Sequence, residues 1–384
     1  NGGTFSLNGT SKLILSNDRS IPSPASGLGV VVPGSNFPGG FSTMNISANS
    51  TVEYSAAAGI NQTIWSTPNY GNLVLSNEAG TGSSIKTNTG TVSVRGTTEV
   101  KSNTIWNMGA NMSTIGSAFV KSGAELQMGT NIISGTGSFT LESGGTLGIG
   151  SAQGITSSGA TGNVQTSGRN FSTGGNYIYN STGAANTGNG LPTTMANLTI
   201  NNTSGITLHA ASANYTVSNT IRLTTGAFVL NGNTLTINNL IRNSGTFSSS
   251  PASSVVVNGT NVPLFFTAGF RFIRNLTIND NASASLGSDL DIAGGTNYGT
   301  LSVGSGATLN TQNRLTLRSN ATGTARVAEI PANPTTGAAL GTITGNVTVE
   351  RFISAQRAWR LLAVPTAGSQ TIRQSWQENQ PQGS

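Results

Sequence analysis

The stretch from Asn197 to Ile237 reads NLTINNTSGITLHAASANYTVSNTIRLTTGAFVLNGNTLTI and shows the repeating pattern most clearly. It contains six short triplets, most of them apolar–polar–apolar, separated by Asn, Gly and Ser: Leu198-Thr-Ile200, Ile206-Thr-Leu208, Tyr215-Thr-Val217, Ile221-Arg-Leu223, Phe228-Val-Leu230 and Leu235-Thr-Ile237. Alternate residues of a strand share a face, so each triplet predicts a short strand with one buried side. The triplets follow one another at short, similar intervals, so three strands and their turns make one coil of about 21 residues.

Two landmarks repeat at approximate multiples of this coil length. One is the pattern aliphatic-x-Ser/Thr-Gly-Ala/Gly-x-Leu/Val, whose glycines are Gly123, Gly144, Gly226 and Gly306, spaced by one, then about four, then about four coil lengths. The other is an Asn-led strand, found at Asn72–Leu75, Asn197–Ile200 and Asn275–Ile278, spaced by about six and about four coil lengths. For both landmarks, the spacing between successive copies is close to a whole number of coils. They predict a solenoid, in which coils must stack because no coil can bury its own apolar row.

We therefore expect an all-β chain with a parallel β-helix over residues 1–330, in about 15–16 coils. Two prolines in Ile330-Pro-Ala-Asn-Pro334 interrupt the regular spacing, so residues 331–342 are expected to form a linker. Beyond it, residues 343–384 read as longer β-strands. This C-terminal segment is expected to be the start of a truncated β-sandwich-like module, or else a cap that covers the open edge of the last coil.

The composition excludes several classes of protein. Of the 384 residues, 51 are Gly, none is Cys and 8% are charged. The lack of Cys excludes a disulfide scaffold and a thiolate metal site, and no apolar run approaches the ~20 residues of a transmembrane helix. The net charge of +6 comes from basic residues scattered singly along the chain, unlike the basic face of a nucleic-acid-binding protein. We therefore expect no nucleic-acid partner and no transmembrane segment.

A further set of segments consists of Thr51–Tyr54, Tyr70–Leu75, Phe139–Gly150, Asn176–Asn180 and Gly188–Pro192. Together with the Asn-led strands they resemble the β-helical repeats of large secreted surface proteins of Bacteroidota, and the resemblance covers nearly the whole chain. It implies right-handed coils and an adhesin-like architecture. It also implies export by type IX secretion through an outer-membrane translocon, and a location outside the cell or on its outer surface. The C-terminal sorting domain of that family is not recognisable in this sequence.

The acidic residues are too dispersed to indicate an enzyme. Glycoside hydrolysis uses two positioned carboxylates, and calcium-dependent lyases need several clustered acids. The twelve acids offer only Asp289-Leu-Asp291 as a close pair. Residues i and i+2 share a strand face, so Asp289 and Asp291 are weak calcium candidates, and an ordinary solvated face is the favoured interpretation. His209, the only His, has no catalytic partner at a recognisable spacing and is expected on a turn or an outer face. We expect no catalytic residue and no cofactor.

Aromatic and basic side chains are the remaining candidates for binding. The larger aromatic residues either stack on sugars or fill the interior of the coils; they are Trp65, Trp106, Tyr54, Tyr70, Tyr177 and Tyr179. Near the C-terminus, Arg351, Arg357 and Arg360 gather around Trp359. These four residues are candidates for contact with an acidic partner or ligand.

The function expected from the sequence is that of a non-enzymatic, adhesin-like stalk of a secreted or cell-surface protein. Its partners would be the secretion translocon during export and a surface glycan or a ligand on a host or neighbouring cell. One alternative is a carbohydrate-binding or polysaccharide-degrading β-helix. Another is passive cargo that travels with the secretion machinery and has no ligand of its own.

Overall fold

The computed structural model describes residues 2–16, 25–27, 30–32, 37–38, 41–209 and 213–354. The chain divides into two units, residues 1–351 and 352–384, and all described strands belong to the first unit. Every regular element of the described residues is a β-strand. Within this part of the chain there is consequently no helix of the length and apolarity needed to cross a membrane.

Most strands belong to two large parallel sheets. The 13-stranded sheet runs through β7 (Gln62–Ile64), β10 (Ser84–Asn88), β13 (Thr104–Met108), β16 (Glu125–Gln127), β18 (Thr146–Ile149), β20 (Asn176–Tyr179), β22 (Thr194–Asn201), β24 (Asn214–Thr225), β26 (Thr234–Arg242), β28 (Ser254–Val257), β31 (Asn275–Ile278), β34 (Thr300–Val303) and β39 (Arg326–Val327). The 10-stranded sheet contains β2 (Lys12–Leu15), β6 (Thr51–Tyr54), β8 (Asn69–Tyr70), β9 (Asn72–Leu75), β11 (Val92–Val94), β12 (Thr98–Val100), β14 (Met112–Thr114), β15 (Ser117–Val120), β17 (Ile133–Leu141) and, paired with β17, β19 (Val164–Phe171).

Smaller sheets complete the coils. The 8-stranded sheet contains β21 (Ala185–Asn186), β23 (Ile206–Thr207), β25 (Ala227–Val229), β27 (Thr246–Ser249), β30 (Phe266–Ile273), β33 (Leu290–Ile292), β36 (Leu315–Leu317) and β41 (Val347–Val349). The 4-stranded sheet contains β29 (Val262–Leu264), β32 (Ser283–Leu286), β35 (Thr308–Asn310) and β40 (Thr342–Thr344). The two-stranded pairs are β1 (Thr4–Leu7) with β5 (Thr43–Ile46), β3 (Ala25–Gly27) with β4 (Val30–Val32), and β37 (Ser319–Asn320) with β38 (Gly323–Thr324).

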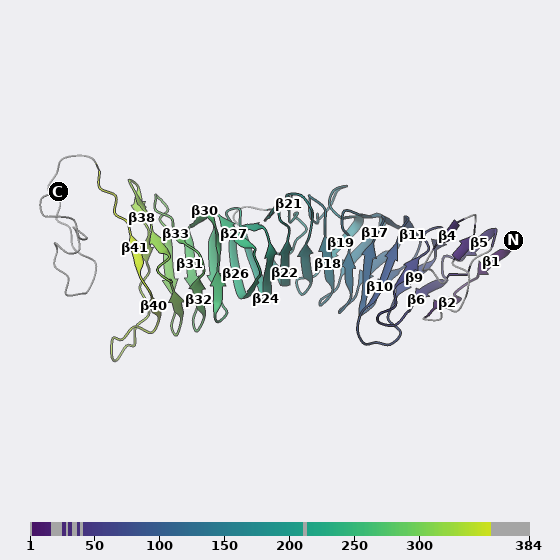
Figure 1. The fold of residues 1–384 in the computed structure, drawn as a ribbon, viewed down its shortest axis with the longest axis horizontal. Helices are drawn as coiled ribbons and strands as arrows, with labels where there is room; N and C mark the ends of the chain where they lie inside the picture. The colour runs from purple at the N-terminus through teal and green to yellow at the C-terminus, as the bar shows by residue number, and fades with distance from the viewer. Residues whose placement is uncertain are drawn as a thin grey trace, which may run out of the picture. The chain divides into compact units, whose positions relative to one another are not determined.

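The strands wind into coils that stack along one axis in the first unit (Figure 1). Strands β10, β11 and β12 form one such coil, and each pairs in parallel with its counterpart one coil earlier and one coil later. The expected parallel β-helix is therefore confirmed. It has about 12 turns with a spacing of about 22 residues, which is fewer turns than predicted, and some coils are long. An example is the coil that separates Thr146 from its strand partner Asn176.

The repeated motifs mark a type of turn rather than a fixed position on the coil. All four landmark glycines have positive φ, from 68° to 78°, as a tight left-handed turn requires. Gly144 precedes a strand of the 13-stranded sheet, β18, whereas Gly226 follows one, β24. Gly226 therefore lies at the next turn within the coil, after the strand of the 13-stranded sheet and not before it. Its separation from Gly144 along the chain is not a whole number of coils. The prediction that all landmarks share one grid was wrong in this respect.

The Asn-led strands likewise share a local interaction. The side-chain Oδ1 of Asn72, Asn197 and Asn275 accepts a hydrogen bond from a backbone N–H in the following coil, at 2.8, 3.1 and 3.1 Å. In each case the donor is a threonine. This explains why the motif recurs: an asparagine at this position fastens its coil to the next coil.

The solenoid extends beyond residue 330. The strands expected after residue 342 are present as β40 and β41, and they pair in parallel with β35 and β36. They therefore form part of a coil, and the segment expected to be a linker is a long loop within it that contains an antiparallel bridge between Ala332 and Ala339. The two prolines interrupt the spacing but not the stacking, since they lie in that loop. Residues 355–384 lie outside the described part of the chain.

A single apolar core runs through the coils. Inward-facing residues of paired strands stack on one another, as in the row Trp106, Leu126, Leu147, Tyr177 and Leu198, and each of them is at most 1% exposed. The six large aromatic residues singled out in the sequence are all within this interior, so they fill coils and do not stack on external sugars. Full burial of one aliphatic side chain contributes about 1.5–3 kcal/mol.

One lysine interrupts the apolar interior. Lys86 lies in the same row as Trp106, pairs with Gln62 of the preceding coil, and is fully buried. Its Nζ donates hydrogen bonds to Gln62 Oε1 at 2.6 Å and Ser84 Oγ at 2.7 Å. Burial lowers the pKa of Lys86 from 10.5 to about 7, an effect that the charge of Glu53 partly opposes. The core therefore contains an amine that titrates near neutral pH.

We predict that Lys86 makes the stability of the solenoid depend on pH. The unfolded chain keeps this proton up to about pH 10.5, whereas the folded chain releases it near pH 7. Stability should therefore rise as the pH increases from about 7 to about 10. Urea unfolding of the wild-type protein and of Lys86→Met across that range tests this, since the variant should lose most of the rise. An equal rise in both proteins would show that Lys86 is not the cause.

Candidate functional site

Asp291 is the centre of an ion-pair cluster on the 8-stranded sheet. It lies in β33, and only 1% of its side chain is exposed. Its Oδ2 accepts hydrogen bonds from Arg271 Nε at 2.9 Å and Arg318 Nη2 at 3.0 Å. The bonds to Asp291 are the largest cause of the raised pKa values of both arginines, so both remain cations. The two arginines belong to the preceding and following coils, and the cluster therefore joins three coils.

Two further carboxylates complete the cluster. Asp289, which is about half exposed, accepts a hydrogen bond from Arg271 Nη1 at 2.7 Å and lies 3.9 Å from Arg314 Nη1. Glu350 accepts one from Arg318 Nη1 at 2.5 Å. Its second oxygen accepts the backbone N–H of Ser319 at 3.2 Å. Three carboxylates and three guanidinium groups thus lie together on the outside of the solenoid.

This geometry does not favour calcium binding by Asp289 and Asp291, the two weak candidates from the sequence. Calcium takes six to eight oxygen ligands, but both carboxylates are bonded to arginines. In the described ranges, no group of three or more acidic, His or Cys side chains is placed to hold a metal ion. The two aspartates are ion-pair partners of arginine, and the cluster's role in the fold is to fasten neighbouring coils.

A hollow of ≈ 350 Å³ adjoins the cluster. Its lining combines apolar and polar side chains and consists of Pro251, Phe272, Ala293, Gly294, Arg318, Ser319, Asn320 and Glu350. Arg318 belongs to both the cluster and the hollow, and its guanidinium carbon lies 5.7 Å from the centre of the Phe272 ring. The ion pair of Arg318 and Glu350 therefore forms a fixed polar wall beside an aromatic ring.

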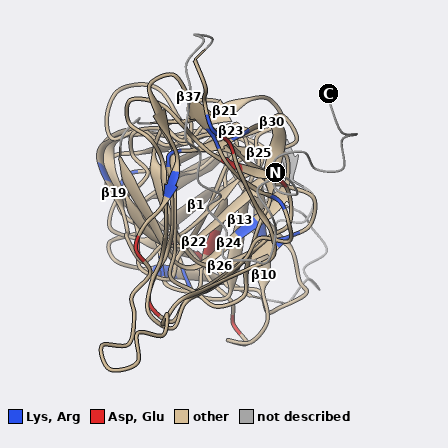
Figure 2. Cartoon of the chain, turned by 90° about the vertical axis from the view of Figure 1, so that its left-hand side faces the viewer, with Lys and Arg blue, Asp and Glu red and all other residues tan. Residues whose placement is uncertain are grey.

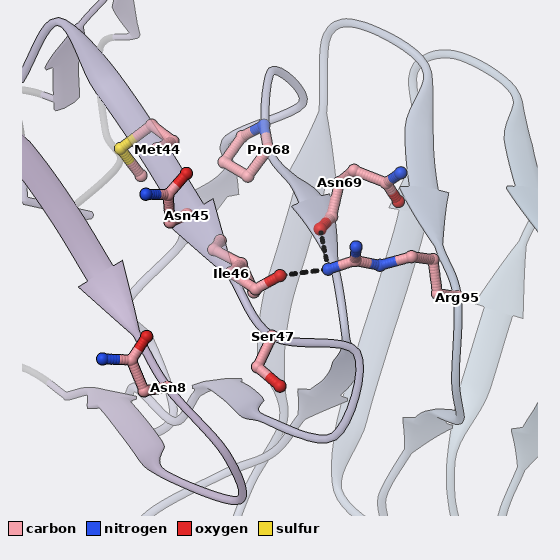
Figure 3. A pocket seen from close by; sticks show the side chains of 8 residues that line it. All are labelled: Asn8, Met44, Asn45, Ile46, Ser47, Pro68, Asn69 and Arg95. Atoms are coloured by element: carbon pink, nitrogen blue, oxygen red, sulfur yellow. Dashed lines mark hydrogen bonds between the residues drawn. The ribbon is translucent and has the colours of Figure 1, made fainter.

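A second hollow, of ≈ 320 Å³, lies near the N-terminal end and is shown in Figure 3. Strand β5 pairs with β1, and β8 pairs with β11, but no ladder joins β5 to β8 among the described strands. The guanidinium of Arg95 reaches across this interruption and donates hydrogen bonds to the backbone oxygens of Ile46 and Asn69. Arg95 therefore replaces missing backbone contacts, and this hollow is a by-product of an interrupted ladder.

The residues proposed from the sequence as partner contacts are only partly within the described chain. Arg351 is exposed and follows Glu350, which lines the first hollow. Trp359, Arg357 and Arg360 lie outside the described residues. His209 is exposed, as expected for a turn or an outer face.

Sequence reasoning missed the residues that build the first hollow. Phe272, Arg318 and Glu350 are far apart in the sequence and belong to coils of different length. A signal existed in the spacing of Arg271, Asp291 and Arg318, because neighbouring members of this set are separated by roughly one coil length. That spacing could be interpreted only once the register of β30, β33 and β36 was known. Figure 2 shows where charged residues lie on the coils. Two further ion-pair groups join Glu53 with Lys12 and Lys101, and Lys121 with Glu99 and Glu142.

Known proteins provide no independent guide to the site. No protein-family model, no curated protein and no solved structure matches this chain. The function is therefore inferred from the fold and from the geometry of the cluster and its hollow.

We predict that the two aspartates of the cluster differ sharply in their effect on stability. Asp291→Asn removes the charge between two partly buried arginines and should lower the free energy of unfolding by about 3–5 kcal/mol. Asp289→Asn removes a half-exposed charge and should cost at most about 1 kcal/mol. Urea unfolding of both variants provides the comparison. Equal losses, or stabilisation of the wild-type protein by added calcium, would contradict this description of the cluster.

Proposed function

We propose that this chain is a non-enzymatic, adhesin-like stalk of a secreted or cell-surface protein, exported by type IX secretion in a member of the Bacteroidota. The observation that carries the proposal is the stacking of about 12 parallel coils on one core. Such a stack keeps residues at its two ends far apart while every coil touches only its neighbours. This is the mechanical requirement for displaying a binding surface away from a cell.

The charged residues fit this role. In the cluster the carboxylates of Asp289, Asp291 and Glu350 are each bonded to an arginine, which fastens coils and leaves no unpaired acid there. Glycoside hydrolysis needs one acid and one base or nucleophile on either side of the scissile bond. The first hollow is lined by a single carboxylate, that of Glu350. Binding is therefore better supported than cleavage at this place.

Carbohydrate binding without cleavage is the second candidate function. The first hollow favours it because an aromatic ring and fixed polar groups line the same space. The two candidates are compatible, since an adhesin can bind a surface glycan.

Adhesion can be measured with beads coated with the purified protein. We predict that the coated beads attach to neighbouring bacterial cells or to host epithelial cells in larger numbers than albumin-coated beads. Incubation of the protein with cell-wall and plant polysaccharides should release no reducing sugar. Attachment no greater than that of albumin-coated beads on every cell type would refute the adhesive role. Release of reducing sugar would favour the alternative of a polysaccharide-degrading β-helix.

The export route is tested separately in the native organism. Cell fractionation should find the protein outside the cell or on its outer surface, and deletion of the type IX translocon should retain it in the periplasm. Normal surface exposure in the deletion strain would contradict the proposed route without affecting the adhesive role.

A further inference from the structure

The first hollow crosses several coils. Ala293, Arg318 and Glu350 occupy equivalent positions, because the backbone N–H of each donates to a carbonyl of the preceding coil at 2.9, 2.9 and 3.0 Å. The acceptors are Ile273, Ile292 and Leu317, respectively. Phe272 and Pro251 line the same hollow from two earlier positions in the chain. A ligand in this hollow would therefore lie across successive coils.

One wall of the hollow is formed by Ser319 and Asn320 of β37, which pairs with β38 in a hairpin. This antiparallel pair is an insertion between two strands of the solenoid. A Cβ atom at Gly294 would lie 2.7 Å from the carbonyl oxygen of Arg318 and 2.9 Å from that of Gly323. The glycine thus allows the hairpin to lie directly against the loop after β33, and the hydrogen bond from Gly295 N to Gly323 O, at 3.1 Å, holds it there. The wall is a built feature of the fold.

The lining groups are held in place without a ligand. Asn320 Oδ1 accepts hydrogen bonds from the backbone N–H groups of Thr322 and Gly323, so its amide group is oriented with Nδ2 available to donate. The Glu350 carboxylate is fixed by Arg318 and by the N–H of Ser319. Fixed polar groups lose little conformational entropy when a ligand binds.

We propose that this hollow binds a segment of a neutral, hexose-containing glycan, an inference that rests on the adhesive role proposed above and names its ligand. The apolar lining of Pro251, Phe272 and Ala293 suits the C–H face of a sugar ring. The carboxylate, guanidinium and amide groups beside it suit the hydroxyl groups of that ring. Its volume of ≈ 350 Å³ lies within the ~300–1,000 Å³ range of small-molecule sites.

The charge of the polar wall and the hydrogen bonding of the backbone around the hollow favour a neutral glycan over other ligands. Arg318 and Glu350 neutralise each other, so the polar wall has no net charge to attract an acidic sugar. A peptide that binds by strand addition needs free backbone groups. The N–H groups of Ala293, Arg318 and Glu350 are already used between coils.

The proposal is tested by calorimetric titration of the whole chain with cellohexaose, mannohexaose and hexagalacturonate. At least one neutral hexamer should bind more tightly than hexagalacturonate. Phe272→Ala and Glu350→Gln should each weaken that binding by about tenfold, because one removes the apolar surface and the other a charged acceptor. Phe270→Ala is the matched control: Phe270 lies on the same strand, is 60% exposed and does not line the hollow, so its effect should stay within about twofold.

Three results would overturn the proposal: no binding of any neutral hexamer, tighter binding of hexagalacturonate, or equal binding by the wild type and by both hollow variants. Thermal unfolding identifies a variant that fails to fold. If Phe272→Ala fails to fold, the binding measured for Glu350→Gln, which keeps the side-chain shape, tests the proposal by itself. The bead assay separates this failure from failure of the adhesive role. Beads that attach normally when coated with Phe272→Ala would leave adhesion intact and place its ligand elsewhere.

Discussion

Backbone hydrogen bonds between neighbouring coils are the interaction on which the structure depends. Every large sheet consists of strands paired in parallel with the next coil, so the sheets share their hydrogen bonds along the whole stack. This explains how a chain with 8% charged residues and 51 glycines can be ordered without helices in its described part. The apolar rows then align automatically, because parallel pairing in register places inward-facing residues above one another.

Arginines are placed where this ladder is irregular. Arg95 bridges the interruption between β5 and β8. Arg169 lies in the lengthened coil between β18 and β20 and donates to the carbonyl of Thr156, in its inserted loop, at 2.8 Å. Arg318 fastens the coil that carries the β37–β38 hairpin. A long side chain with several donors can supply hydrogen bonds to backbone carbonyl groups that have no N–H partner in the ladder. The two hollows lie at two of these irregular places, and the proposed glycan site is one of them.

The sequence predicts the regular part of this architecture because the information is local. Alternating triplets predict strands, and the landmark glycines mark turns. The asparagines mark places where one coil is hydrogen-bonded to the next. The sequence cannot supply the register, because coil lengths vary; this is why Gly226 does not share the grid of Gly144. The burial of Lys86 in the core and the pairing of Asp291 with arginines could not be predicted either, since each residue has partners that lie in other coils. The hollow beside Phe272 depends on five segments and has no local signature at all.

Native-state hydrogen exchange can measure whether the coils form one continuous stack in which each coil stabilises its neighbours. Mass spectrometry of peptides from β10 to β36 should find strand amides that exchange slowly and at similar rates from coil to coil, because each is bonded to a neighbouring coil. The loop around residues 157–161 should exchange much faster. If strand amides in the middle of the stack, such as those of β20 and β22, exchange as fast as this loop, the coils do not stabilise one another.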